Sequence, residues 1–352
     1  MSLDGKKEHY KTFALVTIFL VGNLIIRFPK GEGQQHSFLG YLICFAVSVG
    51  LVFFLNITQF SKKEFALTSL KNKIKNKLFK KSLKILFFTL ILFCFVTTTK
   101  DYTVMLSEIR IQNFPNFLLS IIYLAVVLLL AKCKDRVIYY FAFTNLILIS
   151  LGIVIMFFFS INLFDTAYLI EGMAFNIKNV LNQGLTFFIH SFGQIYLCAF
   201  FIAKNKNQNS KHTVVSGVLV GGVLLLICFL NVILTIGSQI INELQYPYAS
   251  VTAMLVSKDA YNRMDVITYY IYFISNLIKS SVLLKLVNDL FDNKYIPLIF
   301  LLIISLCFSS NEFLAKILLT KSFNFIFLCL EILLPIIVWL LLRTPKIKQK
   351  TD

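Results

Sequence analysis

The chain has 352 residues, of which 58% are hydrophobic and only 14% are charged, and its mean hydropathy is +0.79. Soluble domains are about 45–50% apolar and about 25% charged, so this composition excludes an ordinary soluble enzyme, a disordered chain and a secreted disulfide scaffold. It predicts an all-α integral membrane protein, because a transmembrane barrel alternates apolar and polar residues. The net charge of +17 therefore does not indicate nucleic-acid binding, since the position of each charge relative to the membrane matters more than the sum.

Apolar segments long enough to cross a hydrocarbon core of about 30 Å recur ten times along the chain. We place these predicted spans at Phe13–Phe28, Phe38–Phe54, Leu83–Thr99, Phe117–Ala131, Val137–Phe159, Leu185–Ala203, Val214–Ile236, Val266–Phe291, Ile296–Ser310 and Phe323–Leu342. The sequence thus predicts a single polytopic membrane domain over residues 1–352.

The positions of Lys and Arg predict the orientation of these spans. They are concentrated in the N-terminal tail, in a basic loop at 61–82, in alternate later loops and in the tail 343–352. Because cytoplasmic loops carry the excess of Lys and Arg, both termini are predicted to be cytoplasmic and the loop 237–265 extracytoplasmic. The basic stretch is also compatible with a helix on the anionic leaflet, although a plain determinant of topology is the simpler interpretation.

Ten spans can form two halves of five helices, at about 13–159 and about 185–342, and many transporter folds repeat in this way with a broken first helix in each half. Gly22 in the first span and Gly193 in the sixth lie at corresponding positions, each beside polar residues. Glycine tolerates backbone angles that open a helix, and the opened backbone must then face a ligand, water or protein. The alternative interpretation is that both glycines are close-packing points between helices.

A lysine lies close to the middle of the eighth span. A charge at that depth costs about 2.5–3.5 kcal/mol on insertion scales, so Lys279 is a candidate functional residue. It could face a cavity and hold a carboxylate or replace a bound cation, or it could pair with backbone carbonyls or a distant acid. Glu331, four residues before Pro335 in the tenth span, is a candidate for that acid. Lys285 is expected only to extend its stem towards the cytoplasmic interface.

The sequence offers no support for chemistry other than binding. The seven cysteines lie mostly within the spans and lack metal-ligand spacing, and no P-loop, zinc-protease motif or nucleophile and base pair is visible. We therefore expect no catalytic residue, no metal and no cofactor, and we expect that the protein is not an enzyme.

Three motifs near the seventh and eighth spans resemble the signature region of the GerB family of spore germination proteins, the GerAB- and GerKB-type subunits of germinant receptors. They are LQYPYASV at residues 244–251, YNRMD at 261–265 and FISNLIK at 273–279. The family shows a Tyr-Pro-Ser-like element, a Glu-Arg-Leu-Glu/Asp-like element and a span bearing an Ile-Lys pair. Gly22, seven residues before Pro29, also matches the family's Gly-x-Gly-x-x-x-x-Pro first span.

The resemblance implies a LeuT-like 5+5 inverted repeat of about ten transmembrane helices, with broken first and sixth helices, as in the amino acid/polyamine/organocation superfamily. It also implies a pocket for a small germinant, often an amino acid, and A and C receptor subunits as partners in the spore inner membrane. Together with Asn23 beside the first glycine, the matching positions give the ligand-binding candidates Gly22, Asn23, Thr98, Phe192, Gly193, Lys279 and Leu283.

Some positions depart from the family pattern. Leu24 replaces the second glycine of the first span, and Gln194 and Ile195 occupy a stretch where many relatives carry a Glu. The resemblance therefore does not identify the ligand. The leading hypothesis is a sensing subunit that binds a germinant and triggers germination. The alternatives are an amino-acid transporter of the same fold, and a structural or ion-conducting subunit with a degenerate pocket.

Overall fold

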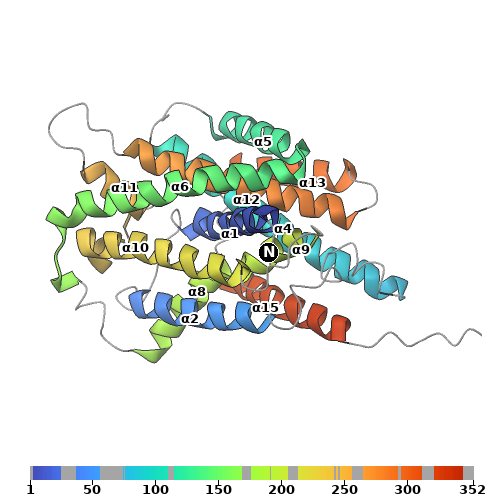
Figure 1. Cartoon of the computed structure of the whole chain (residues 1–352). Coiled ribbons are helices and arrows are strands. Elements are labelled where there is room, and N and C mark those ends of the chain that lie inside the picture. Colours follow the sequence, from blue (N-terminus) through green and yellow to red (C-terminus); the bar gives the residue numbers. More distant parts are fainter. Residues whose placement is uncertain are drawn as a thin grey trace, which may run out of the picture.

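A computed structural model of the chain shows a bundle of helices (Figure 1). The structure describes residues 3–24, 37–55, 74, 76–109, 115–168, 176–190, 192–204, 213–241, 243–244, 246–255, 265–291, 295–310 and 321–343. Within these ranges the regular elements are all helical, which confirms the all-α class predicted from composition.

In the described part of the chain, the helices follow one another with short 3-10 turns at two points. They are α1 (Leu3–Leu24), α2 (Ser37–Leu55), α4 (Lys77–Ile109), α5 (Asn116–Lys132), α6 (Asp135–Ser160), the turn η4 (Ile161–Leu163), α8 (Ile177–His190), the turn η5 (Phe192–Gln194), α9 (Ile195–Ala203), α10 (Thr213–Ile241), α11 (Pro247–Met254), α12 (Asp265–Leu290), α13 (Tyr295–Ser310) and α15 (Lys321–Arg343).

Among the described residues, five helical stretches are long and apolar enough to cross a membrane. They are Lys77–Thr103, Asp135–Leu163, Ile177–Ala203, Thr213–Ser238 and Val266–Leu290. Five shorter apolar helices, His9–Gly22, Phe38–Phe53, Asn116–Lys132, Tyr295–Ser309 and Phe325–Val338, lie at the other predicted spans. The chain is therefore a helical membrane protein, whereas the number of ten spans stays a prediction.

The apolar interior also determines how the polar side chains of the helices bond. Without water, every hydroxyl needs a partner within the protein, and helical Ser and Thr find one in the carbonyl a turn earlier. In α4, Thr98 Oγ1 donates to Cys94 O at 2.6 Å and Thr99 Oγ1 to Phe95 O at 2.9 Å. Such bonds allow a polar cluster of threonines to lie inside an apolar bundle.

Helices α1 and α12 form the interior of the bundle. The side chains of α1 from residue 14 to residue 21 are at most 1% exposed, and α1 packs against α6, α10 and α12. In Figure 1, α1 lies in the centre, with α6 on one side and α2 and α15 on the other. The outer helices expose one apolar face each; α6, for example, exposes Ile147, Leu148, Leu151 and Phe158. These faces are suited to contact lipid.

Two glycines of α10 allow neighbouring helices to approach closely. A Cβ added at Gly217 would lie 2.7 Å from Cβ of Val16, and a Cβ at Gly222 would overlap the Phe45 ring. The buried carbonyls at these positions accept hydrogen bonds from Thr17 Oγ1 at 3.2 Å and Tyr41 Oη at 2.6 Å. Small residues thus join α10 to α1 and α2, as is common between membrane helices.

The segment predicted as an extracytoplasmic loop at 237–265 contains ordered structure. Gly237 has a φ of 74° and kinks α10 one residue after the predicted end of the seventh span. The short helix α11 begins with Pro247, which suits a first helical turn, and buries Tyr248 and Val251. This segment therefore packs against the bundle. Residues 256–264, most of the basic loop 61–82 and the tail after residue 343 lie outside the described residues.

Candidate functional site

The interruption predicted in the sixth span coincides with a change of helix type. Helix α8 ends at His190, and residues Phe192–Gln194 form the 3-10 turn η5 before α9 begins. Phe192, Gly193 and Gln194 are all buried. A 3-10 stretch within a helix leaves main-chain groups without their usual i−4 partners and often marks a functional hinge.

Gln194 bonds in two directions at this interruption. Its Nε2 donates to the carbonyl of Ile189, near the end of α8, at 2.9 Å. Its Oε1 accepts a hydrogen bond of 2.6 Å from Nζ of Lys279 in α12. One carboxamide therefore satisfies a carbonyl at the end of α8 and the ammonium of a neighbouring helix.

Lys279 is only 1% exposed, and its ammonium also lies over an aromatic ring. Nζ is 5.2 Å from the centroid of Phe19 in α1, a distance at which a cation is attracted to the ring face. The sequence left the partner of Lys279 open between a carboxylate, backbone carbonyls and a distant acid. In the structure its hydrogen bond goes to the side chain of Gln194 in the sixth predicted span.

Glu331 of α15 completes the cluster from the other side. It is 2% exposed, and a Cβ added at Gly193 would overlap its Oε2. Lys279 and Gln194 are close enough to interact with it electrostatically, although neither carboxyl oxygen makes a hydrogen bond of standard geometry to any described residue. Pro335 removes the helical bond that would end on the Glu331 carbonyl. We call Gln194, Lys279 and Glu331 the central polar cluster.

The other predicted site residues have different surroundings. Helix α1 continues through Gly22 to Leu24, so the opening predicted at Gly22 is not present at that residue. A Cβ at Gly22 would lie 3.2 Å from the main chain of Ser275 in α12. This short distance agrees with the alternative interpretation, in which Gly22 allows two helices to pack closely. Asn23 lies in α1 with its side chain outside the described residues.

Three further candidates are buried within the bundle. Thr98 is 1% exposed and donates a hydrogen bond to the carbonyl of Cys94. The thiol of Cys94 lies close enough to Lys279 and Glu331 to interact with both electrostatically. The ring of Phe192 lies 6.0 Å from that of Tyr41, within an aromatic group on α2. Leu283 is fully buried in α12, one turn beyond Lys279. The structure thus brings Gly193 and Lys279 together at the cluster and leaves Gly22 as a helix contact.

Gln194 is the site residue that the sequence did not assign. It was visible only as a polar replacement where many relatives carry a Glu, immediately after Gly193. Glu331 was a candidate partner, and its spacing from Pro335 was the useful signal. The described residues contain no group of three or more His, Cys, Asp or Glu side chains that could hold a metal ion.

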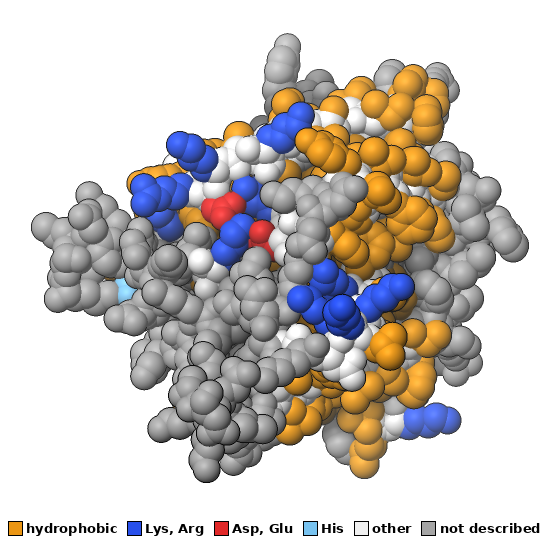
Figure 2. Space-filling view, turned by 90° about the vertical axis from the view of Figure 1, so that its right-hand side faces the viewer, with side chains coloured by type: hydrophobic (Ala, Val, Ile, Leu, Met, Phe, Trp, Pro, Cys, Tyr) orange, Lys and Arg blue, Asp and Glu red, His pale blue; other side chains and the backbone are white. Residues whose placement is uncertain are grey.

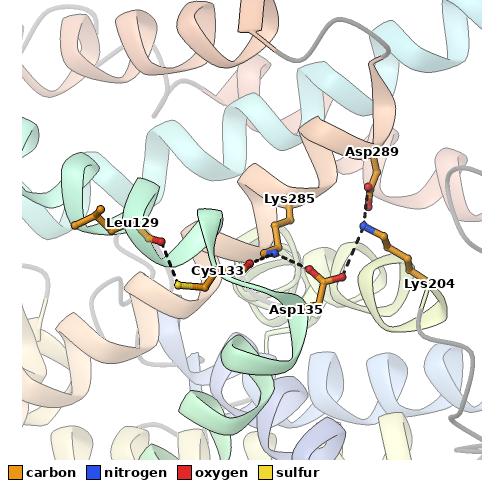
Figure 3. Close-up of polar contacts among 6 residues, drawn as sticks. All are labelled: Leu129, Cys133, Asp135, Lys204, Lys285 and Asp289. Carbon is orange, nitrogen blue, oxygen red and sulfur yellow. Dashed lines mark hydrogen bonds and ion pairs between the residues drawn. The ribbon is translucent and has the colours of Figure 1, made fainter.

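A second group of charges lies at one end of the bundle (Figure 3). Lys285 Nζ donates to Asp135 Oδ1 at 2.6 Å and to the carbonyl of Cys133 at 2.7 Å. Lys204 Nζ donates to Asp289 Oδ1 at 2.8 Å and lies 3.7 Å from Asp135 Oδ2. We call Asp135, Lys204, Lys285 and Asp289 the charge cluster. Lys285 therefore pairs within the protein, which corrects the expectation that it only extends to the interface.

The charge cluster joins the start of α6 to the ends of α9 and α12. Asp135 lies in the first turn of α6, where the helix dipole favours a negative charge. Burial lowers the pKa of Lys204, but its hydrogen bond to Asp289 and the charges of Asp289 and Asp135 outweigh burial, so the net pKa is raised. Gln194, at the start of α9, also bonds to Lys279 of α12. The two ends of α9 are therefore each joined to α12 by a side-chain hydrogen bond.

These features define a polytopic helical membrane protein with a polar site in its interior. The sequence matches the spore germination protein family, described as a spore permease, over residues 8–311. The chain therefore belongs to this family, as the GerB-type motifs predicted, and it is a germination-related membrane protein. A comparison with curated proteins gives no match.

Replacing Gly193 by Ala is expected to destabilise the protein, because the new Cβ would overlap the Glu331 carboxyl group. Overpacking of this kind costs about 1–3 kcal/mol, measurable as a lower Tm in detergent. Gly50→Ala in α2 is the matched control, since a Cβ there meets nothing within 4 Å. Adding Glu331→Ala should recover part of the loss, whereas equal effects at positions 193 and 50 would contradict the contact.

Lys285→Ala should lower stability more than Lys204→Ala. The Lys285 side chain is 11% exposed and bonds to two partners, so its loss should cost about 1–3 kcal/mol of folding free energy. The Lys204 side chain is 36% exposed, so its loss should cost under about 1 kcal/mol.

The pKa of Lys204 is raised on folding, so its contribution to the free energy of folding is complete below pH 10.5 and is lost as the pH rises through the raised pKa. The Tm difference between wild type and Lys204→Ala should therefore stay constant from about pH 7 to about pH 9; a decrease within that range would contradict this assignment.

Proposed function

We propose that this chain is the non-enzymatic sensing subunit of a germinant receptor and that it binds a small molecule at the central polar cluster. Membership of the spore germination protein family supports the biological setting. The observation that carries the proposal is the hydrogen bond of 2.6 Å between Lys279 Nζ and Gln194 Oε1, formed at an interruption of a helix inside the bundle. Buried charge of this kind is expensive in a membrane and is associated with function.

The chemistry of the cluster suits a zwitterion such as an amino acid. The carboxylate of the ligand would replace Gln194 as the partner of Lys279, and its ammonium would approach Glu331, whose oxygens lack a standard hydrogen bond to any described residue. Main-chain groups beside Gly193 would bind the remaining polar atoms, with Thr98, Phe192 and Leu283 around the ligand's side chain. Lys279 would then take the place of the sodium ion in coupled relatives.

Sensing requires that the ligand bind one conformation more tightly than another. The Lys279 to Gln194 bond is charge-assisted, and such bonds contribute about 1.5–3 kcal/mol, so a ligand that replaces it must offer at least as much. Separation of Gln194 from Lys279 would release α9 from α12 at mid-membrane, while the charge cluster still joins them at the other level. The change would pass to the A and C subunits.

The proposed architecture is a LeuT-like 5+5 inverted repeat with about ten spans and both termini in the cytoplasm. The segment α8, η5 and α9 would be the broken sixth helix. The receptor would lie in the inner membrane of the spore.

Lys279→Met is expected to abolish ligand binding, because it removes the ammonium from the site while keeping an apolar stem of similar length. The measurement is a thermal-shift screen of purified full-length protein against amino acids, sugars and nucleosides. Tyr123→Phe is the matched control: it removes a buried hydrogen bond of 2.8 Å between α5 and Ser280 of α12, and it leaves Lys279, Gln194 and Glu331 unchanged. A ligand shift that survives in Lys279→Met would contradict the proposed site.

A transporter of the same fold is the second candidate, favoured by the permease description of the family. Liposomes that contain this chain alone separate the two functions. Binding without uptake of the labelled ligand is expected for a sensor, and uptake that Lys279→Met removes would establish transport. If no compound in the screen shifts the wild-type protein, the structural or ion-conducting alternative gains support, consistent with the unbroken helix at Gly22.

A further inference from the structure

Helix α4 is longer than a membrane span requires. Its 33 residues extend about 50 Å at about 1.5 Å per residue, against a hydrocarbon core of about 30 Å. Its first turn is well defined, because Asn76 Oδ1 accepts the N–H groups of Leu78 at 3.0 Å and Phe79 at 3.4 Å. The N-terminal turns of α4 are therefore helical at the edge of the membrane.

Four lysines share one face of these turns. Lys77, Lys80, Lys81 and Lys84 follow the i, i+3, i+4, i+7 spacing, and the sequence from 77 to 100 contains no Asp or Glu. Positive charge near a helix N-terminus is unfavourable, so the helix dipole does not favour Lys77 and Lys80 in the first turn of α4. Lys77 and Lys81 are exposed, whereas Lys80 and Lys84 are half-buried. We call these four residues the basic face of α4.

Apolar side chains on the same turns are also exposed. Leu78 is 77% exposed, Phe79 42% and Ile85 52%. Lysine stems can lie along such a surface while the ammonium groups extend to the polar boundary. A helix end that mixes exposed lysines with exposed apolar side chains matches the boundary between lipid headgroups and acyl chains.

The basic face lies at the same end of the bundle as the charge cluster. One turn after Lys84, the ring of Phe88 packs edge-on against Phe291 at 5.3 Å, just beyond the end of α12. Figure 2 shows Lys and Arg side chains beside a broad hydrophobic surface. Positive charge and apolar surface thus meet on one side of the protein.

We propose that the basic face of α4 binds the headgroups of anionic phospholipids in the leaflet that surrounds this end of the bundle. The ammonium groups of Lys77 and Lys81 contact the phosphates, and Leu78, Phe79 and Ile85 contact the acyl chains. Electrostatic attraction to an anionic surface contributes about a fivefold gain in affinity for each lysine near it. This surface is independent of the central polar cluster.

The test compares two matched double variants of full-length protein. Lys77→Gln with Lys81→Gln removes the two exposed lysines of the basic face. Lys132→Gln with Lys134→Gln removes two exposed lysines at the turn between α5 and α6, which lies at the same end because Lys285 bonds to Cys133. There Lys132 ends α5 and Lys134 precedes the first residue of α6, so the two lysines do not share one face of a helix. Native mass spectrometry in detergent, with phosphatidylglycerol and phosphatidylcholine as probes, measures the lipid preference of each.

We expect wild type to prefer phosphatidylglycerol. The Lys77 and Lys81 variant should lose about 25-fold of that preference, and the Lys132 and Lys134 variant less than about threefold. Arginine at positions 77 and 81 should retain binding, and high salt should weaken it. The proposal is overturned if wild type has no preference, if both glutamine variants lose it equally, or if the variant at 77 and 81 retains it, which would leave the lysines as a determinant of topology only.

Discussion

The central constraint in this structure is that one buried ammonium group must have a hydrogen-bond partner. Lys279 lies in the interior of an apolar bundle, where an unpaired charge would cost several kilocalories per mole. Its partner, Gln194, reaches it from a 3-10 turn and also bonds to the carbonyl of Ile189. The lysine and the interruption of the sixth span therefore support one another, since each supplies the polar group that the other leaves unsatisfied.

This pairing gives α9 and α12 two distinct connections. One is the hydrogen bond between Gln194 and Lys279 in the interior, and the other is the partly exposed ion pair of Lys204 with Asp289. The first is shielded from solvent and salt, while the second is partly exposed and screened. The interior connection can thus change without directly changing the other.

Composition and hydropathy were sufficient to predict a helical membrane protein, and the motifs were sufficient to predict the family. Lys279 and Gly193 were found because a charge or a glycine at mid-span is conspicuous along the sequence. Gly22 shows the limit of that reasoning, because a glycine that opens a helix and one that packs on Ser275 are identical in sequence. Gln194 was not assigned because its role depends on two partners 5 and 85 positions away. Hydropathy also placed the third span at 83–99, since it detects the lipid-embedded part of α4 and not the polar turns at its ends.

The acidic member of the central polar cluster, Glu331, lies beyond the part of the chain that matches the family. The family match ends at residue 311, whereas Glu331 belongs to α15, at 321–343. The positive and amide groups thus lie inside the family-defining segment, and the carboxyl group is delivered from beyond it. Exchange of this single last helix would alter the charge balance of the interior while the rest of the scaffold stayed the same.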